Sequence, residues 1–520
     1  MTVPADLRLG IDVGGTNTDA VVVDRDDALL AKAKVPTTPD VTTGIAASIE
    51  AVLARLGEGR DRITHAMLGT THATNALLAR TGLRRVAVLR IGGPATRAVP
   101  PLATFPPDLR AAVAAGTAVV DGGIEFDGTE VAPFDSDAAA RFFASVRGRA
   151  DAVAITSVFS AVSDRHELAA EAVARAVLGD VHVSLSHEVG SIGLIERENA
   201  TVLNAALVGV AETVARSFGE ALARQGLRPA EYFAQNDGTL MELEYALRYP
   251  VLTIGCGPAN SIRGAAHISG VRDALVADVG GTSTEVGVLL NGFPGESGDP
   301  AGIGGVRTNF RMPGLVTLPL GGGTVVAGRE RPVRVGPQSV GYRLTESALV
   351  FGGATATLTD AAVAGGRVEV GHRRPPARHR AALAEALARS DALLAEAVDQ
   401  AKVVRGKQPL IVVGGAGFLV PDRVPGVSEV LRPPDHEVAN AIGAAIGQVS
   451  GQVERIARFG VGGRSTAVAE AAESARQQAV RAGADPERTE IVDIEEVPLA
   501  YLTDPAVRIR AKAAGPLRFG

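Results

Sequence analysis

Two segments of this chain carry the same chemical signature. One is Asp12-Val-Gly-Gly-Thr-Asn-Thr-Asp19, and the other is Asp278-Val-Gly-Gly-Thr-Ser-Thr-Glu285. The paired glycines let backbone N–H groups approach phosphate oxygens with no side chain in the way, and the threonine hydroxyls add donors. The leading aspartates can hold a hydrated Mg²⁺, which keeps several waters and uses few carboxylates. Two such copies facing each other would clamp one nucleotide from both sides.

The flanking residues indicate how each signature is positioned. An apolar run precedes each one, at Leu9–Ile11 and Ala274–Ala277, and a second run follows, at Ala20–Asp24 and Val286–Leu290. This order predicts strand, glycine turn and strand, a hairpin with an acid at its mouth. We expect Asp12 and Asp278 to act in catalysis and to hold the metal ion. We expect the two turns to bind the nucleotide through Gly14, Gly15, Thr16, Asn17, Thr18, Gly280, Gly281, Thr282, Ser283 and Thr284.

Two later segments fit the same nucleotide. After a buried strand, the turn residues Gly414, Gly415 and Gly417 would let the backbone pack flat against an adenine or ribose. Asp435 would then cap a helix of small residues, Val438–Val449. Such a helix allows the close contact expected where two lobes hinge. The glycine run Gly321–Thr324 either lines the site or forms a flexible loop, and Asp360 is either a helix cap or a ligand contact.

Polar residues at strand ends and helix starts are the candidates for substrate binding, because binding residues gather on such turns. His72 either caps its helix or acts in catalysis, and Asp237 is either a turn residue or a catalytic acid. Glu196 and Glu198 either stabilise a helix start or touch the substrate. Cys256 is expected to be a small buried residue rather than a nucleophile. The predicted substrate contacts are Thr70, Thr71, Asn75, Asn236, Gly257 and Asn260.

Composition limits the remaining functions. A chain of 520 residues is expected to form two or three domains, and strands alternate with helices in α/β order. Residues 92–135 are rich in glycine and proline and are expected to be irregular. The net charge of −6, the 4% aromatic content and the absence of tryptophan argue against nucleic-acid and anionic-membrane partners. No signal peptide or membrane span is visible, and Cys256 is the only cysteine, so a cytoplasmic protein is expected. The motifs G-x-x-x-x-G-K-[ST], G-x-G-x-x-G, H-E-x-x-H and G-x-S-x-G are absent.

The combined motifs resemble the hydantoinase/oxoprolinase family over about residues 7–450. The resemblance is carried by Asp12–Asp19, Gly69–Asn75, Glu196–Asn204, Asn236–Gly238, Gly257–Ala259 and Asp278–Glu285. It implies an α/β fold of the two-lobed, actin-like ATPase type, which is a duplicated ribonuclease H-like fold. The expected segments are lobes at 1–190 and 191–455 and a C-terminal extension at 456–520.

The resemblance also implies a reaction. Family members open cyclic amides such as hydantoins and 5-oxoproline with ATP and Mg²⁺, through phosphorylation of the amide oxygen. A second hydantoinase-type subunit and an oligomer are implied as well. The chain departs from the larger members at Met312–Leu318, where an Asp and a His are missing, and at Thr345–Gly352, where a Cys-Tyr-Gly element is missing. A small-metabolite kinase with Asp237 or another acid as base, and an ATP-gated regulatory subunit, stay open as alternatives.

Overall fold

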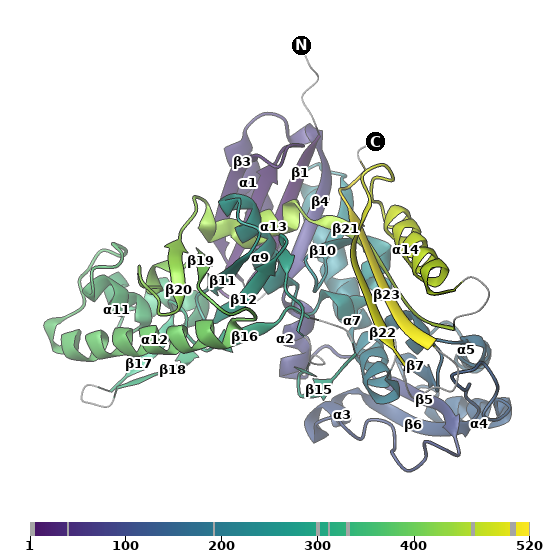
Figure 1. The fold of residues 1–520 in the computed structure, drawn as a ribbon. Helices are drawn as coiled ribbons and strands as arrows, with labels where there is room; N and C mark the ends of the chain where they lie inside the picture. Colours follow the sequence, from purple (N-terminus) through teal and green to yellow (C-terminus); the bar gives the residue numbers. More distant parts are fainter. Residues whose placement is uncertain are drawn as a thin grey trace.

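The computed structural model describes residues 6–38, 41–190, 193–297, 302–309, 312–328, 333–458, 463–499 and 506–518 (Figure 1). Three main sheets organise these residues, with nine, six and four strands. The first two sheets share one plan, and the third is inserted into the first lobe.

The nine-stranded sheet forms the first lobe. Its order is β22-β23-β21-β10-β9-β4-β1-β2-β3. β1 pairs antiparallel with β2 and parallel with β4, so the first glycine signature is the turn of a hairpin. Helices α1 (Val41–Leu56) and α7 (Leu194–Arg224) pack their apolar residues on one face. The strands are β1 (Leu7–Val13), β2 (Asn17–Val23), β3 (Leu29–Pro36), β4 (Ile63–Thr70), β9 (Ala230–Ala234), β10 (Thr239–Glu242), β21 (Gln448–Arg458), β22 (Glu490–Pro498) and β23 (Ala506–Gly515).

The six-stranded sheet repeats this plan in the second lobe. β11 pairs antiparallel with β12 and parallel with β19, as β1 does with β2 and β4. Helices α11 (Leu358–Ala364) and α12 (Arg380–Ala401) cover one face and share its apolar core. The strands are β11 (Ala274–Val279), β12 (Thr284–Leu290), β13 (Phe293–Pro294), β16 (Leu315–Leu318), β19 (Gln408–Val413) and β20 (Val427–Leu431). The duplicated plan confirms the α/β, two-lobed, actin-like ATPase fold.

Two helices cross between the lobes, and each packs on the sheet of the other half. α9 (Cys256–Ser269) follows the first sheet but packs on β11, β12 and β19, whereas α13 (Ala439–Ala445) follows the second sheet but packs on β1 and β2. A β-carbon at Gly264 would lie 1.8 Å from the carbonyl oxygen of Ala439, so only glycine fits at this crossing. The close helix contact expected from the small residues is confirmed. The helix is shorter than predicted, because strand β21 already begins at Gln448.

The four-stranded parallel sheet is inserted between β4 and α7. Its order is β6-β5-β7-β8, with β5 (Val86–Gly93), β6 (Ala114–Asp121), β7 (Ala152–Ser157) and β8 (His182–Leu185). The expectation that residues 92–135 are irregular is wrong, because they contain helix α3 (Pro107–Val113) and strand β6. β6 is an edge strand of small residues with mixed burial, which explains its weak apolar pattern.

The C-terminal residues extend the first sheet. Strands β22 and β23 pair with each other, and β23 pairs with β21, which is bonded to β10. Helix α14 (Gly463–Arg481) covers them with its alanines. The nine-stranded sheet therefore draws strands from all three of the segments 1–190, 191–455 and 456–520, and that division stays a prediction.

Candidate functional site

The two glycine signatures fold into equivalent hairpins. The N–H of Gly14 donates to the carbonyl of Asn17 at 3.0 Å, and that of Gly280 donates to the carbonyl of Ser283 at 2.9 Å. Asp12 lies opposite Asp19 in the first pair of strands, as Asp278 lies opposite Glu285 in the second. Each hairpin thus has the predicted acid at its mouth and a second acid directly across from it.

The tips of the hairpins meet. A β-carbon at Gly281 would lie 2.5 Å from Oγ1 of Thr16, so the two turns are in contact. A β-carbon at Gly15 would find open space within 4 Å. Backbone amides of both turns therefore lie close together between the lobes, with open space beside Gly15 and the Thr16 side chain beside Gly281.

Two glycine loops of the second lobe lie against the second hairpin. Gly322 and Gly323 donate their N–H groups to the carbonyls of Gly280 and Gly281, at 3.0 and 2.7 Å. Gly414 has a φ of +87°, and a β-carbon there would lie 2.4 Å from Oδ1 of Asp278, so the position requires glycine. The turn predicted for the nucleotide, Gly414–Gly417, and the run Gly321–Thr324, left open as site or loop, thus both border the hairpin, and Gly415 faces open space.

The four hairpin acids lie close together, and burial raises the pKa of each of them. Burial, together with the charges of Asp19 and Asp278, raises the pKa of Asp12 to about 7, and burial raises the pKa of Asp278. Burial and the neighbouring Asp278 raise the pKa of Glu285 to about 8. Lys34 forms an ion pair with Asp19 at 2.6 Å. Such a cluster favours a bound cation, which would relieve the repulsion.

The crossing helices hold the two leading acids. The Nδ2 of Asn440, on α13, donates to Oδ2 of Asp12 at 2.7 Å, and the hydroxyl of Ser261, on α9, donates to Oδ2 of Asp278 at 2.5 Å. Asp12, in the first sheet, is therefore held by the helix that follows the second sheet, and Asp278, in the second sheet, is held by the helix that follows the first. The sequence predicted neither contact: Asn440 was not considered, and Ser261 was considered only as part of a helix start. Asn440 could have been found because it is a polar residue in a helix whose other residues are small or apolar.

An open hydrogen-bonding position remains beside Asp12. Oδ1 of Asp12 and Nδ2 of Asn260 are both buried and make no hydrogen bond of good geometry among the described residues, although the Asn260 amide lies close enough to Asp12 to lower its pKa. A β-carbon at Gly69 would lie 2.6 Å from each of them, so the two atoms flank one point. Unpaired buried polar atoms are costly, and a ligand would satisfy them.

The predicted substrate residues divide into two groups. Thr71 donates its hydroxyl to the carbonyl of Val13 at 3.2 Å, the amide of Asn75 reaches Thr71, and a β-carbon at Gly257 would lie 3.9 Å from Thr71. Thr70 contacts Cys256, whose thiol donates to the Thr70 carbonyl at 3.3 Å. Thr70, Thr71, Asn75, Gly257 and Asn260 therefore gather at the mouth of the first hairpin.

His72 and Cys256 are built into the interior. His72 Nδ1 lies 2.5 Å from the hydroxyl of Thr70, and burial lowers the pKa of its imidazole. The ring lines a small apolar cavity with Phe233 and Leu207. Burial raises the pKa of Cys256 to about 12, which fits the expected inert thiol.

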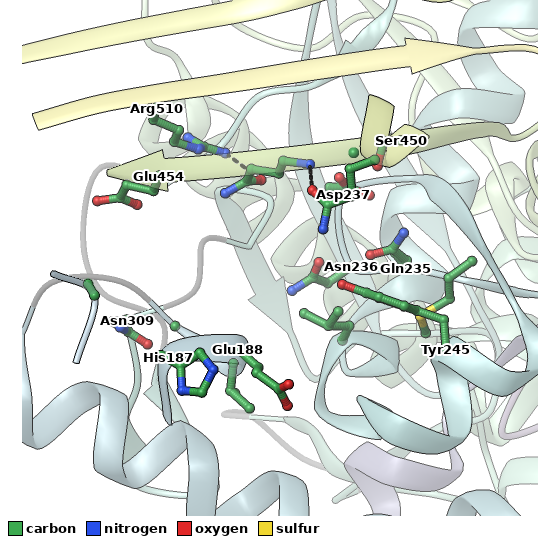
Figure 2. A pocket seen from close by; sticks show the side chains of 18 of the residues that line it. His187, Glu188, Gln235, Asn236, Asp237, Tyr245, Asn309, Ser450, Glu454 and Arg510 are labelled. Carbon is green, nitrogen blue, oxygen red and sulfur yellow. Dashed lines mark hydrogen bonds between the residues drawn. The ribbon is translucent and has the colours of Figure 1, made fainter. Parts of the chain in front are cut away.

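Asn236 and Asp237 lie elsewhere, in the wall of a large cavity (Figure 2). Asp237 forms an ion pair with Lys512 at 2.7 Å and accepts the hydroxyl of Thr239 at 2.5 Å. Burial alone would raise the pKa of Asp237, but the charge and hydrogen bond of Lys512 outweigh it and lower this pKa. The structure therefore does not bring this carboxylate to the hairpins.

Two cap predictions have different outcomes. Asp435 makes no side-chain cap and instead pairs with Lys32 at 2.6 Å, so that prediction is wrong. Its φ of +60° places it in a turn before the helix, which explains the difference. Asp360 is part of a capping box with Thr357, and it also accepts the N–H of Val350 at 2.8 Å.

The described residues were also searched for metal sites and for helices that could span a membrane. Among them, no group of three His, Cys, Asp or Glu side chains is arranged to hold a metal ion by itself. In the same part of the chain, no helix combines the length and apolarity needed to cross a bilayer.

Comparison with protein families and known proteins gives consistent matches. The family model of the hydantoinase/oxoprolinase N-terminal region matches residues 8–178, and the hydantoinase/oxoprolinase model matches residues 197–390. The caprolactamase subunit alpha of Pseudomonas jessenii is 31% identical over 384 residues, which are 69% of this chain and 54% of that protein. An uncharacterized protein of Methanocaldococcus jannaschii is 25% identical over 389 residues, 69% of this chain and 57% of that protein. The chain thus spans just over half the length of these curated relatives.

Two solved structures share the fold. The ATP-dependent caprolactamase from Pseudomonas jessenii superposes with a TM-score of 0.77 at 22% identity and covers 99% of this chain and 88% of its own. Nucleotide-free acetone carboxylase, from a study of ATP-dependent acetone carboxylation, gives a TM-score of 0.74 at 18% identity with the same coverage.

Proposed function

Because the chain belongs to the hydantoinase/oxoprolinase family, we propose that it opens a cyclic amide with ATP and Mg²⁺. The hydantoins, 5-oxoproline and related lactams form the substrate class. The observation that carries the proposal is the meeting of two equivalent glycine hairpins beside Asp12 and Asp278. The caprolactamase relative supports it, since its name states that it acts on a lactam.

The residues present fit a magnesium nucleotide. Asp12 keeps one buried oxygen unpaired, and Asp278 lies near enough to raise its pKa. Mg²⁺ takes few carboxylates and keeps several waters, so two aspartates suffice without a cage of three protein ligands. When bound, ATP with Mg²⁺ supplies the phosphoryl group that activates the amide. Asp12 and Asp278 would hold the metal ion, and the hairpin amides and threonine hydroxyls would bind the phosphates.

The amide chemistry explains why ATP is needed. Resonance makes the amide carbon a poor electrophile, so water attacks an unstrained lactam slowly. Transfer of the phosphoryl group to the amide oxygen makes that carbon reactive. A first water adds to the carbon and the ring C–N bond breaks, which leaves a free amine and an acyl phosphate. A second water hydrolyses the acyl phosphate to a carboxylate and phosphate, so a lactam, ATP and two waters give an amino acid, ADP and phosphate. The chain contributes by binding, by orienting the lactam near Thr71, Asn75 and Asn260, and by excluding water when the lobes close.

The test is phosphate release from ATP across ε-caprolactam, 5-oxoproline and hydantoin. The assay runs with the chain alone and with the proteins encoded next to it. We expect release that depends on one of these lactams and on Mg²⁺, and that is lost in Asp12→Asn and Asp278→Asn. Asp422→Asn, whose side chain is 94% exposed, is the matched control with full activity. ATP binding without turnover on any lactam, alone or with partners, would contradict the proposal.

A partner-dependent role is the second candidate. The relative from Pseudomonas jessenii is named as a subunit, and this chain covers 54% of it. In this version the lobes bind ATP but complete the reaction only within a complex with a second hydantoinase-type subunit. Turnover by the lone chain would exclude it. The kinase alternative would need another acid as its base, because Asp237 is paired with Lys512 away from the hairpins.

A further inference from the structure

The two hairpins differ in the acid that lies across from the leading aspartate. In the first lobe this acid is Asp19, and in the second lobe it is Glu285. A third strand runs beside each hairpin, β3 beside β2 and β16 beside β12. Residues directly opposite each other on neighbouring antiparallel strands have their side chains on the same face of the sheet. The third strand therefore decides which group each of these acids meets.

The third strand of the first lobe supplies a cation. Lys34, on β3, lies opposite Asp19, and its Nζ donates to both carboxylate oxygens, at 2.6 and 2.7 Å. Asp19 is buried, so this contact neutralises its charge inside the protein. The second acid of the first hairpin is thus already paired.

The third strand of the second lobe supplies no cation at the matching position. The residue of β16 opposite Glu285 is Thr317, which is exposed. Glu285 is partly buried, and it forms no hydrogen bond or ion pair with any residue that the structure describes. Its charged neighbours are Asp278, on the same hairpin, and Asp12, in the other lobe. Glu285 therefore keeps its carboxyl group available beside both leading aspartates.

A free acceptor at this place complements one group of a lactam. The ring holds the amide planar, with its N–H and its carbonyl oxygen projecting from the same edge. When the carbonyl oxygen faces the phosphoryl donor at Asp12 and Asp278, the N–H lies beside it and needs an acceptor, since an unpaired N–H is costly once water is excluded. Asp12 and Asp278 are assigned to the metal ion, and Asp19 is paired with Lys34. Glu285 is the hairpin acid that remains.

We propose that Glu285 accepts the ring N–H of the lactam and makes the site specific for secondary lactams. This inference names the substrate class of the proposed function more narrowly and rests on it. A carboxyl group offers an acceptor oxygen whether or not it is protonated, so the contact does not depend on the ionisation of Glu285. An N-alkylated lactam would leave Glu285 unpaired and press an alkyl group against it. Sites that bind a substrate N–H reject analogues that lack it.

Titration followed by NMR tests this preference without turnover. The intact chain is loaded with Mg²⁺ and a non-hydrolysable ATP analogue, and the probes are ε-caprolactam and 5-oxoproline, each with its N-methyl form. We expect the N–H form of at least one probe to bind at least about tenfold more tightly than its N-methyl form. This preference without any lactam-dependent phosphate release would refute only the proposed function. Lactam-dependent phosphate release without the preference would refute only the role of Glu285.

Three variants assign the preference to Glu285. Glu285→Ala removes the acceptor and makes room for a methyl group, so the two forms of a probe should bind with similar affinity. Glu285→Gln keeps an acceptor oxygen and should keep most of the preference. Thr317→Lys places an ammonium opposite Glu285, as Lys34 lies opposite Asp19, and should abolish the preference while Glu285 stays in place.

Two exposed positions of the second lobe provide matched controls. Glu429→Ala and Thr345→Lys should keep the wild-type preference. The proposal is overturned if neither probe binds to the wild type at millimolar concentration, or if Glu285→Ala or Thr317→Lys retains the wild-type preference. It is also overturned if Glu285→Ala weakens binding of the magnesium nucleotide and leaves the preference intact, because Glu285 would then serve the metal ion.

Discussion

Asp12 is buried and Asp237 keeps only 15% of its side chain exposed, both lie beside a tight turn, and the sequence marks both as catalytic candidates, yet their surroundings differ. Asp12 has two acids as near charges and an amide from Asn440, and burial raises its pKa to about 7. Asp237 has Lys512 at 2.7 Å and two donors from Thr239, and its pKa is lowered. The comparison shows that the charged neighbours of an aspartate, rather than its residue type or its burial, decide its state. Asp237 is neutralised by a cation of the protein, whereas Asp12 has acids as neighbours and can bind a cation of a ligand.

The largest expected effect is on activity at the hairpin acids. Asp12→Asn should reduce lactam-dependent phosphate release at least about 1,000-fold, roughly 4 kcal/mol of transition-state stabilisation. The melting temperature should stay equal or rise, because the neutral amide removes repulsion with Asp19 and Asp278. Phosphate assays and thermal unfolding of the same preparation measure both. A variant that loses activity together with several degrees of melting temperature would mean that Asp12 is structural, like Asp237.

The local sequence pattern was enough to predict the hairpins that carry Asp12 and Asp278. The glycines, the acids and the flanking apolar runs all lie within a few residues, so both hairpins follow from strand and turn chemistry. Helix Val41–Leu56 was likewise readable from its apolar period. The donors Asn440 and Ser261 were not, because each reaches its acid through a helix that packs on the other half's sheet.

The second region depends on contacts that no local pattern reveals. Lys512 meets Asp237 only because the C-terminal strand β23 joins the first sheet through β21. His187 is likewise oriented by Glu167, which lies on a different helix. A sequence shows which residues can ionise, but the pairing of distant strands decides which charges are neutralised.

Removal of the cation at Asp237 should cause the largest loss of stability. Lys512→Met leaves a buried carboxylate without its partner, and we expect a loss of about 3 kcal/mol in the free energy of unfolding. The double variant Asp237→Asn/Lys512→Met should recover part of that loss. Lys402→Met is the control, since its partner Asp399 is 80% exposed and such pairs contribute under about 1 kcal/mol. Urea unfolding measures all of them. Equal effects of Lys512→Met and Lys402→Met would remove the contrast between the two regions.

Helix α9 contacts both regions, through Ser261 at Asp278 and through Ala259 beside Gly238, and a substitution where it meets α13 should have an intermediate effect. Gly264→Ala places a β-carbon 1.8 Å from the Ala439 carbonyl, so the helices must move apart at a cost of about 2 kcal/mol. The shift displaces Asn260 and Ser261 from the hairpin acids, so ATP affinity should fall as well. Gly219→Ala, inside α7 with 3.4 Å to its nearest side-chain atom, should be neutral or stabilising. Urea unfolding and nucleotide titration distinguish the two variants, and a neutral Gly264→Ala would show that the crossing is loose.

The smallest effect is a pH dependence at Asp237. Its folded-state pKa is lowered, so its ion pair contributes fully above the unfolded pKa near 3.9 and is lost as the pH falls through the lower folded value. The free energy of unfolding of the wild type should therefore exceed that of Asp237→Asn by roughly 1 to 2 kcal/mol at pH 6. This difference in stability should become steadily smaller below about pH 4. Asp422→Asn, which removes an exposed ion pair, should change the free energy of unfolding by under about 0.5 kcal/mol both at pH 6 and below pH 4. A gap that stays constant down to pH 3 would mean that Asp237 acts through hydrogen bonds that an asparagine also makes. If the stability difference between the wild type and Asp237→Asn grew on acidification, the folded-state pKa of Asp237 would lie above its unfolded value, as that of Asp12 does.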